Sequence, residues 1–170
     1  RGGSATVHFP IWHQEIRDII VLKNNKGTED NRVRKLDYSI QLSALFYQRF
    51  IDNEKITLFS PHDVAGLYDS FGTESFDDLY KQYELDESIP KTQVDAQELI
   101  LDLLKERAET GRLYLMNIDH CNSHSSFTDK VEMSNLCQEI TLPTKPIQHI
   151  DDKTGEIALC ILSAINVGKI

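Results

Sequence analysis

The chain has 170 residues, of which 40% are apolar and 26% are charged, so it is long enough to bury one hydrophobic core and has an ordinary globular composition. Its net charge of -9 argues against a general nucleic-acid binder, because contact with a phosphate backbone needs clustered Lys and Arg. No apolar stretch reaches the ~20 residues of a membrane span, and residues 1–10 lack the layout of a signal peptide. We therefore expect a cytoplasmic protein with no membrane partner.

The two ends of the chain predict a piece of a larger protein. It begins at Arg1 without a methionine and ends at Ile170 directly after an apolar run. No repeat, low-complexity tract or Pro-rich linker divides it. We expect one partial domain over residues 1–170, truncated at both ends and without an internal boundary.

The first third of the chain predicts a helix, a loop and a second helix. Residues 11–22 mix apolar and polar side chains at helical spacing, whereas residues 23–35 are polar and charge-rich, as is typical of a surface loop. Asp37 can cap a helix that runs to about Asp52 and should be largely buried. The apolar stripe of that helix is Ile40, Ala44, Tyr47 and Ile51, widened by Leu45, Phe46 and Phe50.

The middle of the chain predicts a strand, a turn and a helix. Residues 56–59 form a short β-type run that Ser60 and Pro61 break, and residues 71–83 have a helical rhythm. The aromatic residues of the latter segment, Phe76, Tyr80 and Tyr83, are most simply core.

A longer helix should span residues 92–110. Thr92 and Asp95 resemble a capping box, and Gly111 is the usual C-terminal stop. The apolar stripe of this helix is Ala96, Ile100, Leu103, Leu104 and Ala108.

The last third of the chain contains two expected strands. Residues 113–118 follow Gly111 directly, and residues 157–165 are a near-continuous apolar run with β-branched side chains, as expected for a strand covered on both faces. Alternating strands and helices indicate an α/β architecture with parallel pairing.

Three polar residues at alternate positions are the strongest candidates for chemistry. Asn135, Cys137 and Glu139 would project to one side of an extended segment, where the carboxylate could act as a base while the sulfur acts on a neighbouring atom. The alternative is a half-buried strand in which Cys137 is a small hydrophobe and the other two side chains are solvated, which is the commoner fate of such residues. Spacing alone favours the alternative.

The remaining ligand-type residues do not predict a metal site or a disulfide framework. The three cysteines, Cys121, Cys137 and Cys160, are few and have no Cys-x-x-Cys spacing. His120 and His124 flank Cys121, and His62 stands beside Asp63, but zinc ligands usually occur in pairs at tighter, repeated spacing. We expect loop histidines and no metal.

Eleven short blocks of the sequence resemble the large, catalytic chains of class I aerobic ribonucleotide reductases, and several of them are similar in sequence to the enzymes of T-even-like bacteriophages. The blocks are residues 1–3 (RGG), 21–25 (VLKNN), 31–34 (NRVR), 56–63 (ITLFSPHD), 66–69 (GLYD), 106–108 (ERA), 110–112 (TGR), 119–122 (DHCN), 134–140 (SNLCQEI), 142–144 (LPT) and 155–160 (GEIALC). The resemblance implies an internal piece of the ten-stranded α/β barrel of that family, including its finger loop.

The resemblance also implies a reaction, the reduction of ribonucleoside diphosphates to their 2′-deoxy forms. Cys137 matches the cysteine that becomes a thiyl radical and removes the 3′ hydrogen, Glu139 the carboxylate that takes the 3′-hydroxyl proton, and Asn135 the amide that bonds the ribose hydroxyls. Cys160 matches one of two redox-active cysteines that end as a disulfide, which a thioredoxin or glutaredoxin reduces. The second cysteine of that pair lies upstream of this chain in the family.

Substrate selection and partners are further implications of the resemblance. Arg1, Gly2 and Gly3 match the end of the specificity loop through which nucleotide effectors act. The family is a large-subunit homodimer, and its radical comes from a metal centre in a separate small subunit, so no cofactor is expected in this chain. Two alternatives stay open: an adenosylcobalamin-dependent reductase, which shares the Asn, Cys, Glu arrangement, and an inert fragment or split-gene piece that needs complementation.

Overall fold

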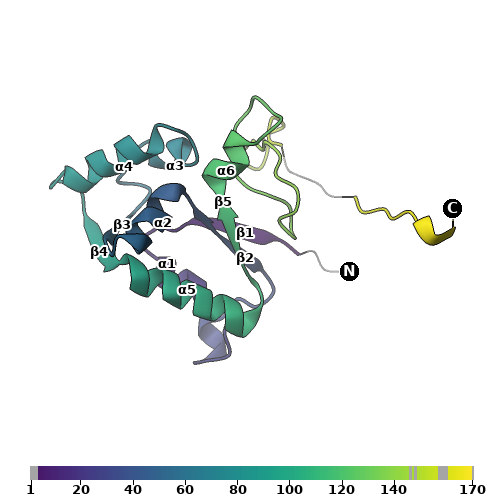
Figure 1. Cartoon of the computed structure of the whole chain (residues 1–170), viewed down its shortest axis with the longest axis horizontal. Helices are drawn as coiled ribbons and strands as arrows, with labels where there is room; N and C mark the ends of the chain where they lie inside the picture. The colour runs from purple at the N-terminus through teal and green to yellow at the C-terminus, as the bar shows by residue number, and fades with distance from the viewer. Residues whose placement is uncertain (1–3, 146, 148, 157–160, 170) are drawn as a thin grey trace.

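The computed structural model describes residues 4–145, 147, 149–156 and 161–169, and these residues have a mixed α/β architecture (Figure 1). The strands are β1 (Thr6–Pro10), β2 (Asp37–Leu42), β3 (Lys55–Phe59), β4 (Lys91–Asp95) and β5 (Leu113–Asn117). The α-helices are α1 (Ile16–Ile20), α2 (Ala44–Ile51), α3 (Leu67–Ser70), α4 (Phe76–Leu85), α5 (Ala96–Thr110) and α6 (Ile118–Ser123). Two 3₁₀ turns, η1 (Glu29–Asn31) and η2 (Val167–Lys169), complete the elements.

The strands form two sheets. In the larger sheet the order is β1-β2-β5 and both pairings are parallel, which requires the helical crossovers that the chain supplies between them. Strands β3 and β4 form a separate antiparallel pair. The two sheets meet where the backbone after β1 runs beside the end of β3, with Phe59 N donating to Trp12 O at 2.8 Å. The expected parallel α/β pairing is confirmed for the larger sheet.

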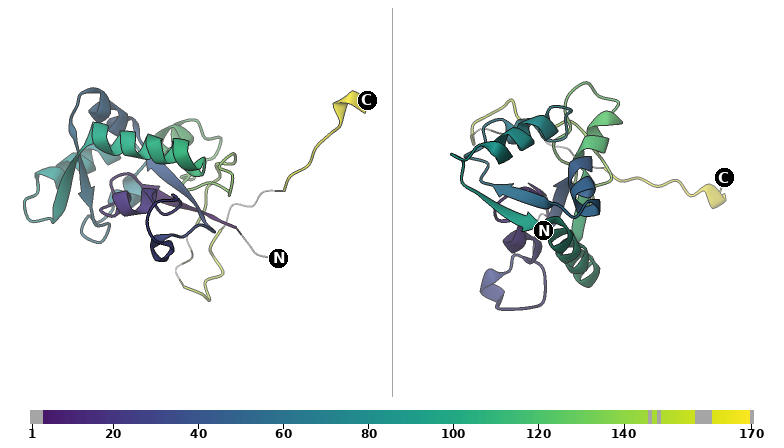
Figure 2. Two further views of the ribbon diagram at one scale, coloured as in Figure 1. Left: turned by 90° about the horizontal axis from the view of Figure 1, so that it is seen from below. Right: turned by 60° about the vertical axis from the view of Figure 1, so that its left-hand side comes forward.

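The two faces of the larger sheet differ in chemistry. Residues such as Tyr38 and Ile40 alternate along β2 with Ser39 and Gln41, so one face is apolar and the other polar. Helix α5 lies along the sheet and contacts β5, α1 and α2 (Figure 2). On the polar face the register aligns His8 of β1 with Ser39 and Ser39 with Tyr114 of β5.

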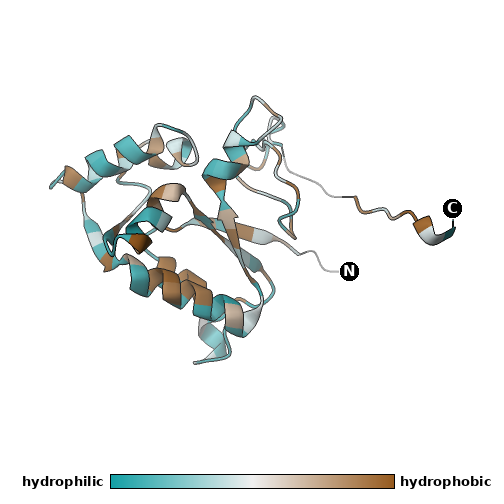
Figure 3. Cartoon of the chain, in the orientation of Figure 1, coloured by the Kyte–Doolittle hydropathy of each residue, from teal (hydrophilic) through white to brown (hydrophobic). Residues whose placement is uncertain are grey.

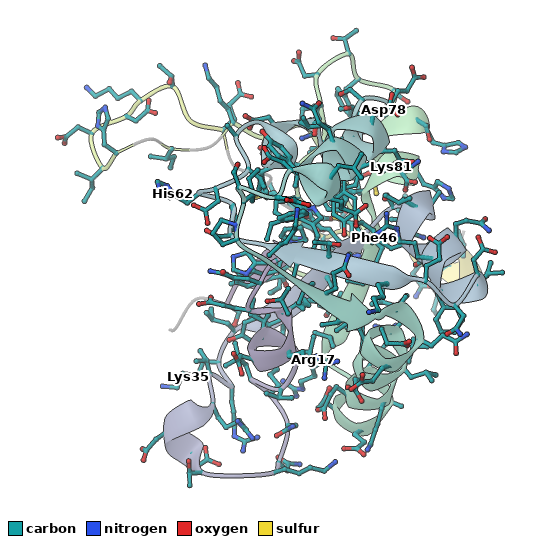
Figure 4. The ribbon with its side chains drawn as sticks, turned by 90° about the vertical axis from the view of Figure 1, so that its left-hand side faces the viewer. Arg17, Lys35, Phe46, His62, Asp78 and Lys81 are labelled. Carbon is teal, nitrogen blue, oxygen red and sulfur yellow. The ribbon has the colours of Figure 1, made fainter. Side chains whose placement is uncertain are left out.

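An aromatic cluster forms the centre of the core. Phe46 of α2 is fully buried, and its ring centroid lies 5.5 Å from that of Tyr80 and 6.2 Å from that of Phe71 (Figure 4). Phe76 and Tyr80 of α4 are also fully buried. The prediction that the aromatic residues of this segment are core is confirmed for these two.

The predicted helix over residues 37–52 is wrong in its first half. Asp37 begins strand β2, and the helix starts only at Ala44. Because β2 takes Ile40 into the sheet, the expected stripe is broken, and Tyr47 and Ile51 are 37% and 71% exposed. The polar and apolar residues of 37–42 alternate with the two-residue period of a strand, and the segment forms a strand although a helical spacing also fits its apolar residues.

The start of the predicted helix over residues 92–110 is also wrong, whereas its end is confirmed. Thr92 lies in β4, and Asp95 is the true N-cap, with Glu98 N donating to Asp95 Oδ1 at 2.9 Å. The helix ends at Gly111, which has the left-handed φ of 64° expected of a C-terminal glycine. Leu99 is buried in the core, whereas the predicted Leu104 is 43% exposed.

Three other element predictions differ from the structure in extent. Only Ile16–Ile20 of residues 11–22 is α-helical, and the helix expected over 71–83 begins at Phe76. Residues 157–160 of the last predicted strand lie outside the described residues. Residues 161–165 are largely apolar (Figure 3) but form no strand. Ile161 is 95% exposed.

No helix in the described part of the chain is long and apolar enough to cross a bilayer.

Candidate active site

A loop crosses the polar face of the larger sheet and carries the predicted site residues. Thr6 Oγ1 of β1 donates to Leu136 O at 2.6 Å, and Gln41 Nε2 of β2 donates to Glu132 O at 2.5 Å. These bonds satisfy polar groups that would be costly to bury alone, since Gln41 is only 1% exposed. The polar face of the sheet is therefore a docking surface for residues 132–138.

The residue after Cys137 makes the most extensive contact with the sheet. Ser39 Oγ donates to Gln138 Oε1 at 2.6 Å, and Gln138 Nε2 donates to Leu115 O at 2.7 Å. One side-chain amide thus joins the loop to both β2 and β5. Sequence reasoning missed Gln138, since a single glutamine carries no periodic signal.

Residues 134–140 form a turn, so the prediction of an extended segment with one shared face is wrong. Gln138 N donates to Asn135 O at 3.1 Å, and Ile140 N donates to Asn135 Oδ1 at 3.0 Å. Ser134 Oγ donates to Ile140 O at 2.6 Å and closes the base of the turn. The side chain of Asn135 stabilises the turn, because it bonds a backbone group that would otherwise be available to pair with a neighbouring strand.

The turn separates the three predicted residues by exposure. Asn135 is 7% exposed, whereas Cys137 and Glu139 are exposed at its outer side. Because Asn135 Oδ1 accepts bonds within the turn, Nδ2 is the group of that side chain with which a ligand could bond. The spacing of the three residues in the sequence did not predict that Asn135 would be buried while Cys137 and Glu139 are exposed.

Tyr114 of β5 is a residue on which Cys137 and Glu139 both act electrostatically. Burial raises the pKa of Tyr114, and Asp37, Cys137 and Glu139 raise it further. Arg112 acts in the opposite direction. Cys137 and Glu139 therefore both influence one residue of β5, although they do not share the face of a strand.

His8 is a second residue that sequence reasoning missed. Its Nε2 accepts a long hydrogen bond of 3.4 Å from Ser134 N, and its buried Nδ1 has no partner among the described residues. Burial lowers the pKa of His8 below its ordinary value, so the imidazole is neutral at pH 7. The alternation of Thr6 and His8 along β1 could have indicated a polar sheet face.

The remaining predicted residues do not join this site. Arg1, Gly2, Gly3 and Cys160 lie outside the described residues, so their predicted roles stay predictions. Cys121 is a half-buried free thiol whose pKa is raised by burial. It lines a pocket of about 350 Å³ together with Gln138, at the carboxyl end of β5.

The three histidines weighed as metal ligands, His62, His120 and His124, lie in a turn after β3 and on or just after helix α6. His120 and His124 form an edge-to-face ring pair with centroids 5.9 Å apart, and His62 is exposed after β3 (Figure 4). No group of three His, Cys, Asp or Glu side chains in the described residues is arranged to hold a metal ion. A pocket of about 580 Å³ between α2, α4 and α6 contains none of the predicted site residues.

Comparison with known proteins matches the whole chain to one family. The model of the family described as ribonucleotide reductase, barrel domain, covers residues 1–170. The ribonucleoside-diphosphate reductase subunit alpha of Haemophilus influenzae is 57% identical over 100% of this chain and 23% of its own length. The ribonucleoside-diphosphate reductase 1 subunit alpha of Escherichia coli is 54% identical over 86% of this chain and 20% of its own length.

A bacteriophage relative is less similar. The subunit alpha of phage T4 is 45% identical over 96% of this chain and 22% of its own length. These identities do not favour the expected similarity to T-even-like phages over a bacterial source. The chain spans less than a quarter of the length of all three relatives.

Proposed function

The chain belongs to the ribonucleotide reductase barrel-domain family, and we propose that the whole protein of which it is a part reduces ribonucleoside diphosphates to 2′-deoxyribonucleoside diphosphates. The relatives named as ribonucleoside-diphosphate reductase alpha subunits support this proposal, since the subunit of Haemophilus influenzae aligns with 100% of this chain. Because the chain spans 23% or less of those proteins, the activity is a property of the complete subunit.

One observation carries the assignment of the site. Cys137 is exposed at a turn that is hydrogen-bonded to the polar face of a parallel sheet, and Glu139, two residues further along the same turn, is also exposed. An accessible sulfur and an accessible carboxylate in one turn, on a support of buried polar side chains, supply a thiol and a base that can act on one substrate. The apolar face of the same sheet serves only the core.

In the proposed reaction Cys137, as a thiyl radical, removes the 3′ hydrogen atom of the ribose. Glu139 takes the 3′-hydroxyl proton, and Asn135 Nδ2 donates to a ribose hydroxyl. The 2′-hydroxyl leaves as water, and two electrons come from Cys160 and a second cysteine outside this chain, which end as a disulfide. The hydrogen atom then returns from Cys137 to the 3′ carbon.

The proposed setting is a cytoplasmic enzyme with partners, in a host cytoplasm if the source is a phage. The name subunit alpha supports a second subunit, and we assign to it the metal centre that generates the radical. A thioredoxin or glutaredoxin would reduce the disulfide, nucleotide effectors would act through Arg1, Gly2 and Gly3, and the large subunit would form a homodimer. The parallel strands with one polar face support the ten-stranded barrel with Cys137 on its finger loop.

Two alternatives remain distinguishable. An adenosylcobalamin-dependent reductase would turn over with that cofactor and without a second subunit, and the alpha-subunit names of the relatives favour the two-subunit form. A split-gene piece would be inert alone and active when the flanking segments are added.

The test uses the full-length subunit with its radical-generating partner and a substrate tritiated at the 3′ position. Cys137→Ser should abolish tritium release and product formation together. Cys121→Ser is the matched control, because it removes a half-buried thiol on α6 that is not in the turn, and it should retain both. Product formation by Cys137→Ser at the rate of the control would overturn the proposed function.

A further inference from the structure

Gln138 connects the turn that carries Cys137 to two strands through one side chain. Its Oε1 accepts from Ser39 Oγ at 2.6 Å, and its Nε2 donates to Leu115 O at 2.7 Å. Ser39 is fully buried, so its hydroxyl has no solvent to replace Gln138 as an acceptor. The position therefore needs an acceptor and a donor on one side chain, which an amide supplies and a carboxylate, thioether or hydrocarbon does not.

The backbone of Gln138 adopts a left-handed conformation that glutamine disfavours, so other contacts must stabilise it. Gln138 has a φ of 67°, and Asn53 is the one other non-glycine residue with a positive φ in the described part of the chain. Asparagine is several-fold enriched in the left-handed region, whereas a glutamine side chain has no such local compensation. The long-range bonds to Ser39 and Leu115 are the contacts that hold Gln138 in this conformation.

Cys137 lies between two anchored neighbours. The peptide carbonyl of Leu136 accepts from Thr6 Oγ1 of β1 at 2.6 Å, and Gln138 is bonded to β2 and β5. All three strands of the sheet thus fix the residues on either side of the thiol, while Cys137 itself is exposed. The side chain of Gln138 supplies two of these three anchors.

We propose that Gln138 is a positioning residue that sets the place of the Cys137 sulfur relative to the substrate, an inference that rests on the proposed function. Removal of an atom by Cys137 requires the reacting atoms in near contact, and a displacement of about 1 Å can reduce a rate by roughly 100-fold. Gln138 itself does not touch substrate. Its loss should slow the hydrogen-transfer step without weakening substrate binding.

The test compares variants of the full-length subunit, assayed with its radical-generating partner. Gln138→Met keeps the side-chain volume and removes both hydrogen bonds, and Gln138→Gly relieves the positive φ while removing the same bonds. Ser39→Ala removes one bond from the other partner. Gln82→Met is the matched control, because Gln82 is exposed on α4.

We expect Gln138→Met and Gln138→Gly to lower kcat by roughly 10- to 100-fold with KM within about twofold of the control. The kinetic isotope effect with a 3′-deuterated substrate should rise, because hydrogen removal becomes the slow step. Ser39→Ala should change both quantities in the same direction and by less. A role in folding alone would lower the amount of active enzyme and leave the isotope effect unchanged.

The outcomes separate this inference from the proposed function. If Gln138→Met or Gln138→Gly matches Gln82→Met in kcat and isotope effect, Gln138 is not a positioning residue, whatever Cys137→Ser does. If either variant does not fold, an unchanged isotope effect in Ser39→Ala overturns the inference equally. Activity of Cys137→Ser would instead remove the proposed function itself.

Discussion

Arg49 of α2 forms a bidentate ion pair with Glu84 of α4, with N–O distances of 2.5 and 2.6 Å. The two side chains are only 10% and 14% exposed. Thr57 Oγ1 of β3 donates to the same carboxylate at 2.6 Å, and the Arg49 guanidinium lies 5.1 Å from the centroid of the Tyr80 ring. The pair therefore connects two helices and a strand around the aromatic core.

Breaking this pair should destabilise the chain strongly. Glu84→Ala leaves a buried guanidinium without its carboxylate, and we expect the free energy of unfolding in urea to fall by about 3–5 kcal/mol. Glu98→Ala is the control, because its pair with Arg17 is 43% and 58% exposed and should contribute at most ~1 kcal/mol. Equal small losses in the two variants would contradict a structural role for the buried pair.

Two glycines with positive φ should respond differently to alanine. Gly72 has a φ of 86°, and a Cβ there would lie 2.8 Å from Ile118 Cγ1 and 3.1 Å from Ile118 O, whereas a Cβ at Gly111 would meet nothing within 4 Å. Gly111→Ala should cost about 1–2 kcal/mol from backbone strain alone. Gly72→Ala should cost more in the same urea titration, because α6 must also move. Equal costs would mean that the contact with α6 relaxes freely.

Elements with local signals were predictable from sequence. The end of α5 followed from Gly111, since a left-handed C-terminal residue is a property of the chain at that point. Strand β3 was predicted over residues 56–59 because a β-type run ends at Ser60 and Pro61. In both places the residues that decide the structure are neighbours in sequence.

Strand β2 was not predicted, because its decisive contacts are distant in sequence. Residues 37–42 fit a strand period, but Ile40 and Ala44 also begin a helical stripe. What favours the strand is pairing with β1 and β5, and burial of Ser39 and Gln41 under residues 132–138. A polar residue on a buried strand has no sequence signal unless its partner is known.

The candidate site was located from sequence but not its geometry. The spacing of Asn135, Cys137 and Glu139 identified the segment, and resemblance supplied the roles. The turn depends on Asn135 Oδ1 accepting from Ile140 N, which a strand model cannot contain. The support from Gln138 was missed because its partners on β2 and β5 lie 99 and 23 residues away in sequence.

Substitution of the proposed radical cysteine, Cys137, and of the proposed redox-active cysteine, Cys160, should stop the reaction at different steps. In the full-length subunit, Cys160→Ser should still release tritium from a 3′-tritiated substrate, since Cys137 is intact, but should form no product over repeated turnovers because the dithiol is incomplete. Cys137→Ser should do neither. Tritium release and deoxynucleotide formation are measured on the same samples, with Cys121→Ser as control. Sustained product formation by Cys160→Ser would remove its redox assignment.

His8 should make the stability of the chain depend on pH. Burial lowers the pKa of His8 in the folded state below the ordinary 6.5. Between the folded-state pKa and 6.5, the unfolded state therefore binds more protons than the folded state. The free energy of unfolding is therefore complete above pH 6.5 and falls as pH is lowered through that value. His13 acts in the same direction, since burial also lowers its pKa.

The contribution of His8 can be isolated from that of His13 by substitution. His8→Gln keeps a hydrogen-bonding side chain beside Ser134 but cannot bind the proton, so its stability should fall less than that of the wild type between pH 7.5 and 5 in urea titrations. His13→Gln should reduce the remaining slope, and the two effects should add because each histidine titrates at its own site. His62→Gln, at an exposed loop, is the control for loss of a histidine. If His8→Gln and His62→Gln have the same dependence on pH, the imidazole under the Cys137 turn is not held neutral by burial, and water must reach the polar face of the sheet.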